Sequence, residues 1–178
     1  MFTREQALEA LNNAGCPPGV VRHILAVEKL ASEIAREISE NGHNIDTKLV
    51  EIGALLHDIG RSQTHGITHG VKGGGILRSL GLEKYVPFAE NHLGAGIPAD
   101  EAKELGLPDR DFVPKTLEEK VVTYADNLVA GNRVTSYEKA FEDFKRKIGA
   151  KRSALERFEK LHKEIQVLRE GRNDLGAH

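Results

Sequence analysis

Helical periodicity is the feature that most restricts how this chain can fold. Apolar residues recur every three or four positions along most of its 178 residues, and no alternating apolar and polar run is long enough to predict a strand. The clearest stripe lies between residues 20 and 39, at Ile24, Val27, Ala31, Ile34 and Ile38. We therefore expect an all-α fold, a helical bundle around an aliphatic core.

Start and stop signals divide the chain into consecutive helices. Residues 3–6 and 116–119 have the form of capping boxes, and an apolar helical run ends at Gly60. Between residues 94 and 114, glycines and prolines predict a long irregular connection with one helical turn in it. Connections of this length often border functional sites.

Length and composition fit one domain, residues 1–178. With 39% hydrophobic and 29% charged residues the composition is that of an ordinary soluble protein, and a formal net charge of -2 argues against a general nucleic-acid binder. The single cysteine, Cys16, excludes an intramolecular disulfide and favours a reducing compartment. Because no run suits a membrane span or a signal peptide, we expect a cytoplasmic protein without membrane contact.

The chemistry centres on His57 and Asp58, adjacent residues at the end of an apolar helical stretch. His23 and Asp126 lie on the flanks of two other apolar stripes, so both side chains are expected to point inward. Each residue alone is more simply a hydrogen-bonded core residue, and Asp126 could also pair locally. Together they would leave several polar groups in one core, which a divalent metal resolves.

The order His, then His-Asp, then a distant Asp resembles the HD-domain metal-dependent phosphohydrolase superfamily, in its His-Asp-Ile-Gly subgroup. The resemblance covers residues 20–131 and implies an all-α metal-binding core, with residues 132–178 as a helical extension. It implies that His23 is the first metal ligand, that His57 and Asp58 form the signature pair, and that Asp126 is the closing ligand.

Two further elements look like the branch of the superfamily that holds two metals. Residues 69–77 are similar to its His-x-x-x-Gly element, and residues 90–94 are similar to its next His element. The resemblance implies that Asp58 bridges two ions, with His69 and His92 on the second ion. Histidine and aspartate ligands suit Mn, Fe, Co, Ni or Zn, and the ligand types leave the choice among them and between one and two ions open.

The sequence departs from the family pattern at two places. Relatives usually continue His-Asp-Ile-Gly with a lysine, whereas this chain has Arg61, which with Lys72 is a candidate phosphate contact, a solvated surface role being the alternative. The Gly-Tyr-Pro element of cyclic-di-GMP phosphodiesterases is missing, which counts against that substrate. His65 matches no motif position, and we expect it to be an exposed loop residue.

The resemblance implies a phosphohydrolase that cleaves a phosphate ester of a nucleotide or another small phospho-compound by metal-activated water. A bound divalent ion lowers the pKa of its water from about 16 toward about 7. In this reading Asp58, Arg61 and Lys72 take part in catalysis. One alternative is a nucleotide-sensing or scaffold module that keeps the metal without turnover, and another is an interaction protein with structural histidines.

The C-terminal extension carries basic and apolar residues whose partners the sequence leaves open. Basic residues 145–147 and 151–152 alternate with acidic ones, which indicates a solvated helical face. An apolar stripe from Ala154 to Leu168 packs either on the domain or on a second copy, so a homodimer is a hypothesis. The expected partner is a small phosphate-containing substrate, a nucleotide, and not a nucleic acid.

Overall fold

The computed structural model of this chain describes residues 2–149 and 151–171, and most of them lie in helices, which confirms the all-α prediction. The end of the expected C-terminal extension, residues 172–178, lies outside the described residues. The α-helices are α1 (Arg4–Ala14), α2 (Pro18–Glu40), α3 (Thr47–Leu56), α4 (His69–Ser79), α5 (Val86–Glu90), α6 (Ala99–Glu104), α7 (Leu117–Leu128), α8 (Tyr137–Lys147) and α9 (Arg152–Glu170). The short elements are the 3₁₀ helices η1 (Ile59–Ser62) and η2 (Glu83–Tyr85) and the strands β1 (Val129–Ala130) and β2 (Arg133–Val134).

The centre of the fold is formed by α2, α3 and α7, which pack on one another. All five residues of the predicted α2 stripe are fully buried, as are Val121, Val122 and Ala125 of α7. The three helices begin with different caps: Pro17 precedes α2, whereas Asp46 and Thr116 accept hydrogen bonds from the first turns of α3 and α7. Their apolar faces therefore meet in one core, and each brings polar residues to its edge.

A hairpin with strands of two residues each follows α7, a feature that the sequence did not predict. Val129 pairs with Val134 and Ala130 with Arg133, and Gly131 takes a left-handed conformation with φ of 62°. Strands of two residues are too short to produce a detectable alternation. The hairpin lies against α2 and brings its turn to His23.

The long connection between α5 and α7 contains α6, which confirms the expected helical turn. It also has a small core of its own, which the sequence did not predict. Its buried residues are Leu93, Ile97, Ala102, Leu107 and Phe112. Ile97 and Phe112 exchange two backbone hydrogen bonds of 2.8 Å. The connection is therefore an ordered layer beside the main core.

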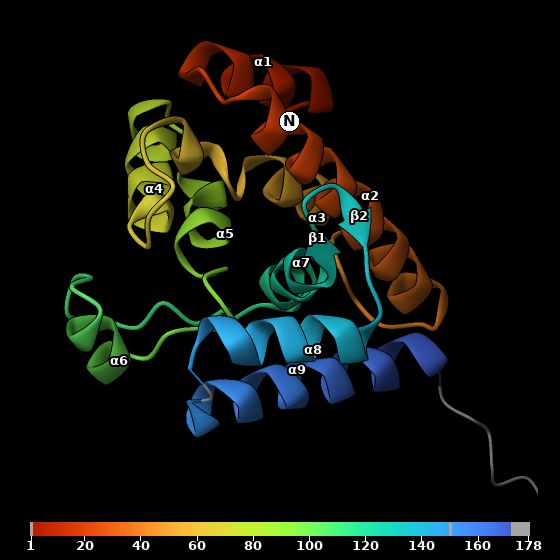
Figure 1. Cartoon of the computed structure of the whole chain (residues 1–178). Helices are drawn as coiled ribbons and strands as arrows, with labels where there is room; N and C mark the ends of the chain where they lie inside the picture. The colour runs from red at the N-terminus through yellow and green to blue at the C-terminus, as the bar shows by residue number, and fades with distance from the viewer. Residues whose placement is uncertain (1, 150, 172–178) are drawn as a thin grey trace, which may run out of the picture.

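Helices α8 and α9 run side by side along one edge of the molecule (Figure 1). The α9 stripe of Ala154, Phe158, Leu161 and Ile165 is buried, and α9 packs on α7, α8 and α2. The stripe is thus occupied within the chain, so a homodimer would need another surface. Among the described residues, no helix combines the length and the apolar character needed to cross a membrane.

Candidate metal centre

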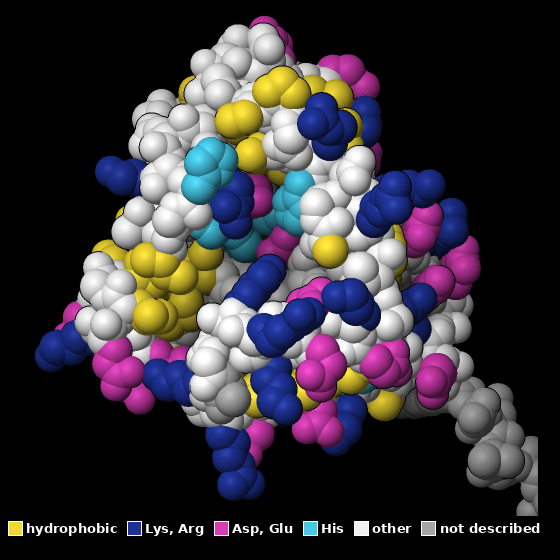
Figure 2. Space-filling view, viewed as in Figure 1, with side chains coloured by type: hydrophobic (Ala, Val, Ile, Leu, Met, Phe, Trp, Pro, Cys, Tyr) yellow, Lys and Arg dark blue, Asp and Glu magenta, His cyan; other side chains and the backbone are white. Residues whose placement is uncertain are grey.

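Residues from five parts of the chain converge on a hollow in one face of the molecule, where Figure 2 shows histidine side chains gathered. They come from α2, from the two residues that follow α3, from the start of α4, from the turn after α5, and from α7. These are the six predicted ligands His23, His57, Asp58, His69, His92 and Asp126. The structure brings all of them together, and their binding of a metal stays a prediction.

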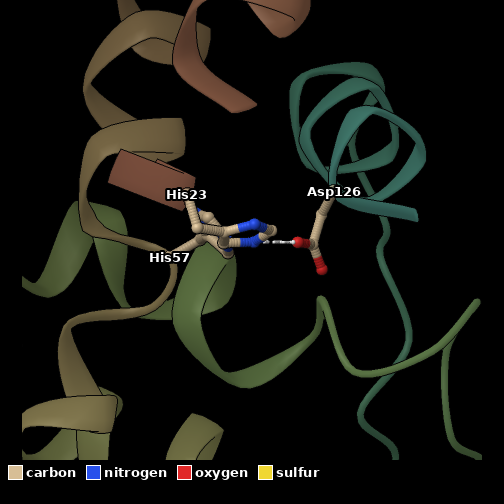
Figure 3. Close-up of side chains that lie close together, drawn as sticks. All are labelled: His23, His57 and Asp126. Carbon is tan, nitrogen blue, oxygen red and sulfur yellow. Dashed lines mark hydrogen bonds and ion pairs between the residues drawn. The ribbon is translucent and has the colours of Figure 1, made fainter. Parts of the chain in front are cut away.

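One half of the cluster contains His23, His57 and Asp126. The Nε2 atoms of His23 and His57 lie 2.8 and 3.4 Å from Oδ1 of Asp126, and Figure 3 shows both rings pointing toward that carboxylate. Oδ2 of Asp58 lies 3.8 and 3.7 Å from the same two nitrogens. Ligand atoms of His23, His57 and Asp126 therefore all lie within 4.8 Å of one another, with Oδ2 of Asp58 next to the two histidines.

The other half contains His69 and His92. Their Nε2 atoms are 3.1 Å apart and lie 3.2 and 3.3 Å from Oδ1 of Asp58. Asp58 thus presents one oxygen to each half, which is the arrangement that a bridging carboxylate requires.

The hydrogen bonds of the four histidines determine which ring nitrogen faces the cluster. In each ring Nδ1 lies 2.6–2.8 Å from a backbone carbonyl oxygen, the pairs being His23 with Gly131, His57 with Ala54, His69 with Gly66 and His92 with Ala89. Since a carbonyl oxygen only accepts, each Nδ1 carries a proton and donates it. In the neutral rings Nε2 then offers a lone pair to the cluster, as it does in metal-ligating histidines.

Two buried atoms test whether these residues fit a metal. Among the described residues, Nε2 of His57 and Oδ1 of Asp58 are buried without any hydrogen-bond partner. Burying unpaired polar atoms is costly, and the facing lone pairs of His69 and His92 repel each other. A divalent cation in each half would satisfy all of these atoms, so the donor set fits.

The charges of the cluster also favour a bound cation. Burial lowers the pKa of His57, but Asp58 and Asp126 outweigh it and raise that pKa to about 9. Burial raises the pKa of Asp126, but the hydrogen bond with His23 and the neighbouring His57 ring hold it far below its usual range. Burial keeps the pKa of His92 below that of an ordinary histidine. Without a metal, the carboxylates are thus compensated by protons, which a cation would displace.

The end of α3 explains how two neighbouring side chains reach one centre. The sequence predicted a helical run to Gly60, but α3 ends at Leu56, and Asp58 leaves the helix with φ of -105° and ψ of 13°. A continuous helix would turn the two side chains about 100° apart. Here His57 caps α3 and Asp58 begins the tighter turn of η1. The early end of α3 explains why the side chains of His57 and Asp58 both face the cluster.

Glycines explain how His69 is placed. A Cβ atom at Gly60 would lie 1.9 Å from the carbonyl oxygen of His69, so only glycine allows η1 to approach the start of α4 so closely. A Cβ at Gly74 would lie 2.3 Å from the carboxylate of Glu90 on α5. Gly60 and Gly74 therefore let α4 pack directly on η1 and α5.

Arg61 lies beside the cluster, and Lys72 does not. Nε of Arg61 donates to Oδ2 of Asp58 over 2.7 Å, and its side chain lines a cavity of about 230 Å³ next to the cluster. His65 is exposed, as expected, yet it also lines this cavity. Lys72 is exposed on α4 and is not among the lining residues, so its role stays a prediction.

The sequence reading missed the residues that support the turn of His92. Thr116 accepts a hydrogen bond from the Glu119 backbone, as in a capping box, but the Glu119 carboxylate accepts from Asn91 Nδ2 at 3.0 Å and from the Lys115 backbone instead of from Thr116. Glu90 is buried as well. The sequence signal for Glu90 is its position directly after the apolar residues 86–89, because an acidic side chain there is costly to bury without partners.

Comparisons with known proteins agree with this geometry. The family model described as "HD domain" matches residues 20–131. The chain is 47% identical to an uncharacterized protein of Methanocaldococcus jannaschii, MJ0778, over 92% of this chain and 97% of that protein. It is 42% identical to a protein of Thermoplasma volcanium named tRNA (cytidine(56)-2'-O)-methyltransferase, over 90% of this chain but only 46% of that relative. The crystal structure of the HD domain of the L. monocytogenes phosphodiesterase PgpH shares the fold, with a TM-score of 0.57, 21% identity and coverage of 92% and 93% of the two chains.

Proposed function

This chain belongs to the HD-domain family, and from that premise we propose that it is a phosphohydrolase that uses two divalent metal ions to cleave a phosphate ester of a nucleotide or another small phospho-compound. The observation that carries the proposal is the convergence of unpaired acceptors, with Asp58 facing both halves of the cluster. When bound, the cations would supply water of lowered pKa and neutralise phosphate charge.

The chain's own residues prepare the centre for this chemistry. His23, His57 and Asp126 would hold one cation, and His69 and His92 would hold the other, with Asp58 shared. Backbone carbonyls hold the rings in place, so little reorganisation accompanies binding.

The adjacent cavity supports a phosphate-bearing substrate. Arg61 lines it, and so do Gly19 and Val20 in the first turn of α2, where no side chain caps the helix. Arginine and a free helix start both favour anions. Its volume of about 230 Å³ is below the roughly 300–1,000 Å³ that encloses a drug-sized ligand. We therefore expect the phosphate end to enter while the remainder of the substrate stays outside.

A larger cavity fits this role less well. It measures about 450 Å³ and lies between α1 and α4, and none of its lining residues belongs to the metal cluster. None of the six candidate metal ligands lines this cavity, so its larger size does not make it the site of the reaction.

A second candidate substrate is a phosphate ester at the end of an RNA. The T. volcanium relative, whose length this chain spans by 46%, carries a name that places its action on tRNA. A cavity that admits only the phosphate end is compatible with a large molecule outside it. This candidate differs from the expectation of a small substrate, and the same assay separates the two.

Hydrolysis of defined phosphate esters tests the proposal directly, with nucleoside and nucleotide products measured as well as inorganic phosphate. The chain is stripped with chelator, reloaded with Mn²⁺, Co²⁺ or Zn²⁺, and incubated with nucleoside monophosphates, dinucleotides and a 3′-phosphorylated oligoribonucleotide. We expect metal-dependent hydrolysis of at least one class. Metal retention with thermal stabilisation by a nucleotide but no turnover would favour the sensing module. A chain without metal affinity would contradict both the phosphohydrolase and the sensing module.

A further inference from the structure

Glu90 is a buried carboxylate that neither the metal cluster nor the cavity uses. It is the last residue of α5 and is 5% exposed. Its two oxygens each accept a hydrogen bond of 2.8 Å, one from Arg78 on α4 and one from Arg110 in the long connection. A buried charge of this kind needs such partners, and its energetic benefit over an apolar residue is small. Its position suggests what it does.

Glu90 lies where α4 and α5 meet. Helix α4 begins with His69, and the turn after α5 carries His92. Gly74 on α4 leaves space for the Glu90 carboxylate, because a Cβ there would lie 2.3 Å from it. The ion pair with Arg78 therefore joins α4 to the end of α5, close in the chain to His92, and the Nε2 atoms of His69 and His92 lie 3.1 Å apart.

Arg110 extends the contact to a third segment. Its guanidinium lies 4.0 Å from the ring centroid of Phe112, and Phe112 is fully buried in the small core that also contains Leu93, the residue after His92. The Glu90 carboxylate thus joins α4, α5 and the long connection around the turn of His92.

We infer that Glu90, with Arg78 and Arg110, is a positioning residue for the His69–His92 half of the metal centre. It touches neither the candidate ligands' Nε2 atoms nor the cavity, and it acts by holding α4 and the His92 turn in register. The inference rests on the proposed two-metal function. The half formed by His23, His57 and Asp126 has no contact with this ion pair, so the two halves should respond differently.

Titration with Mn²⁺ tests the inference without an activity assay. The full chain is stripped with chelator, bound Mn²⁺ is measured by equilibrium dialysis, and affinities are measured by calorimetry. For Glu90→Gln, which keeps the side-chain shape but removes the charge, we expect the second ion to bind about 10- to 100-fold more weakly, the usual effect of losing an outer contact of a metal site. The first ion should bind as in the wild type.

Glu101→Gln is the matched control. Glu101 is also buried, at 9% exposure, and pairs through both oxygens with Arg157 over 3.0 and 2.6 Å, away from the cluster. It should leave both affinities unchanged. If Glu90→Gln does not fold, two further variants probe the same contact: Gly74→Ala displaces the carboxylate, and Arg110→Gln removes one of its two partners. Both should weaken the second ion.

The outcomes separate the inference from the proposed function. Folded Glu90→Gln with two wild-type affinities, or an equal loss in Glu101→Gln, would overturn the role of Glu90 alone. A wild-type chain that binds one ion or none would overturn the two-metal proposal and the role of Glu90 together.

Discussion

At the scale of single residues, Asp58 is the side chain on which the whole centre depends. It is 1% exposed, and its two oxygens face different histidine pairs. Arg61, three residues further along the chain, donates to the oxygen that faces His23 and His57. Asp126, by contrast, contacts only His23 and His57 within the cluster. This difference makes two substitutions diagnostic.

We expect Asp58→Asn to lower metal content in both halves and Asp126→Asn in one half only. The amide lacks the negative charge that offsets a divalent cation, and in Asp58 that charge is shared between the halves. Metal analysis of both variants, purified without chelator, measures this. Equal losses in the two variants would contradict the shared role of Asp58.

Arg61→Met is expected to reduce kcat/KM for phosphate-ester hydrolysis, measured at saturating metal because Arg61 also donates to Oδ2 of Asp58. A hydrogen bond to a charged group contributes about 1.5–3 kcal/mol, which corresponds to roughly 10- to 100-fold. Lys72→Met is the matched variant and should have a smaller effect, because Lys72 does not line the cavity. A larger loss at Lys72 would show that the substrate approaches over α4.

At the scale of elements, the geometry of the site depends on where helices end and on where two backbones approach closely, more than on how many residues are helical. Residues 3–6 form the complete capping box that their sequence predicts. Helix α3, however, ends four residues before Gly60, because the tertiary contact of η1 with α4 favours a tighter turn there. Local propensity does not register such a contact.

Two glycine substitutions test the packing of α4. Gly60→Ala places a Cβ 1.9 Å from a backbone oxygen, and we expect it to destabilise the chain by about 1–3 kcal/mol or more. Gly75→Ala, on the opposite side of α4 in open space, should stabilise by up to about 1 kcal/mol. Urea unfolding at fixed metal concentration measures both. A neutral Gly60→Ala would disprove the close approach.

At the scale of the whole molecule, polar contacts hold the long connection to the rest. Arg157 on α9 pairs with Glu101 on α6, and its Nε donates to the carbonyl of Gly96. Ser153 donates a further hydrogen bond to Glu101. The C-terminal helices thereby hold the part of the long connection that contains α6, and they carry none of the candidate ligands.

The stabilising effect of this contact should depend on pH. Hydrogen bonds from Arg157 lower the pKa of Glu101 in the folded chain, against a smaller effect of burial. Because this pKa is lower in the folded chain, the contact stabilises the fold at pH values above the unfolded pKa of about 4.3. That stabilisation is lost as the pH falls through the folded pKa. Glu101→Gln should therefore melt at a lower temperature than wild type at pH 7, and the difference should shrink below about pH 4. A gap that widens in acid would contradict this account.

The sequence by itself determined the helical class and the candidate ligands. Periodicity follows from burying one side of each helix, and His23, His57 and the two aspartates stand out because such groups are costly to bury alone, whereas His69 and His92 were expected from the family resemblance. Only the tertiary structure decided that α3 ends before Asp58, that the hairpin brings Gly131 to His23, and that Glu90 pairs with two arginines. These features depend on contacts between residues far apart in the chain, which the pattern of neighbouring residues does not encode.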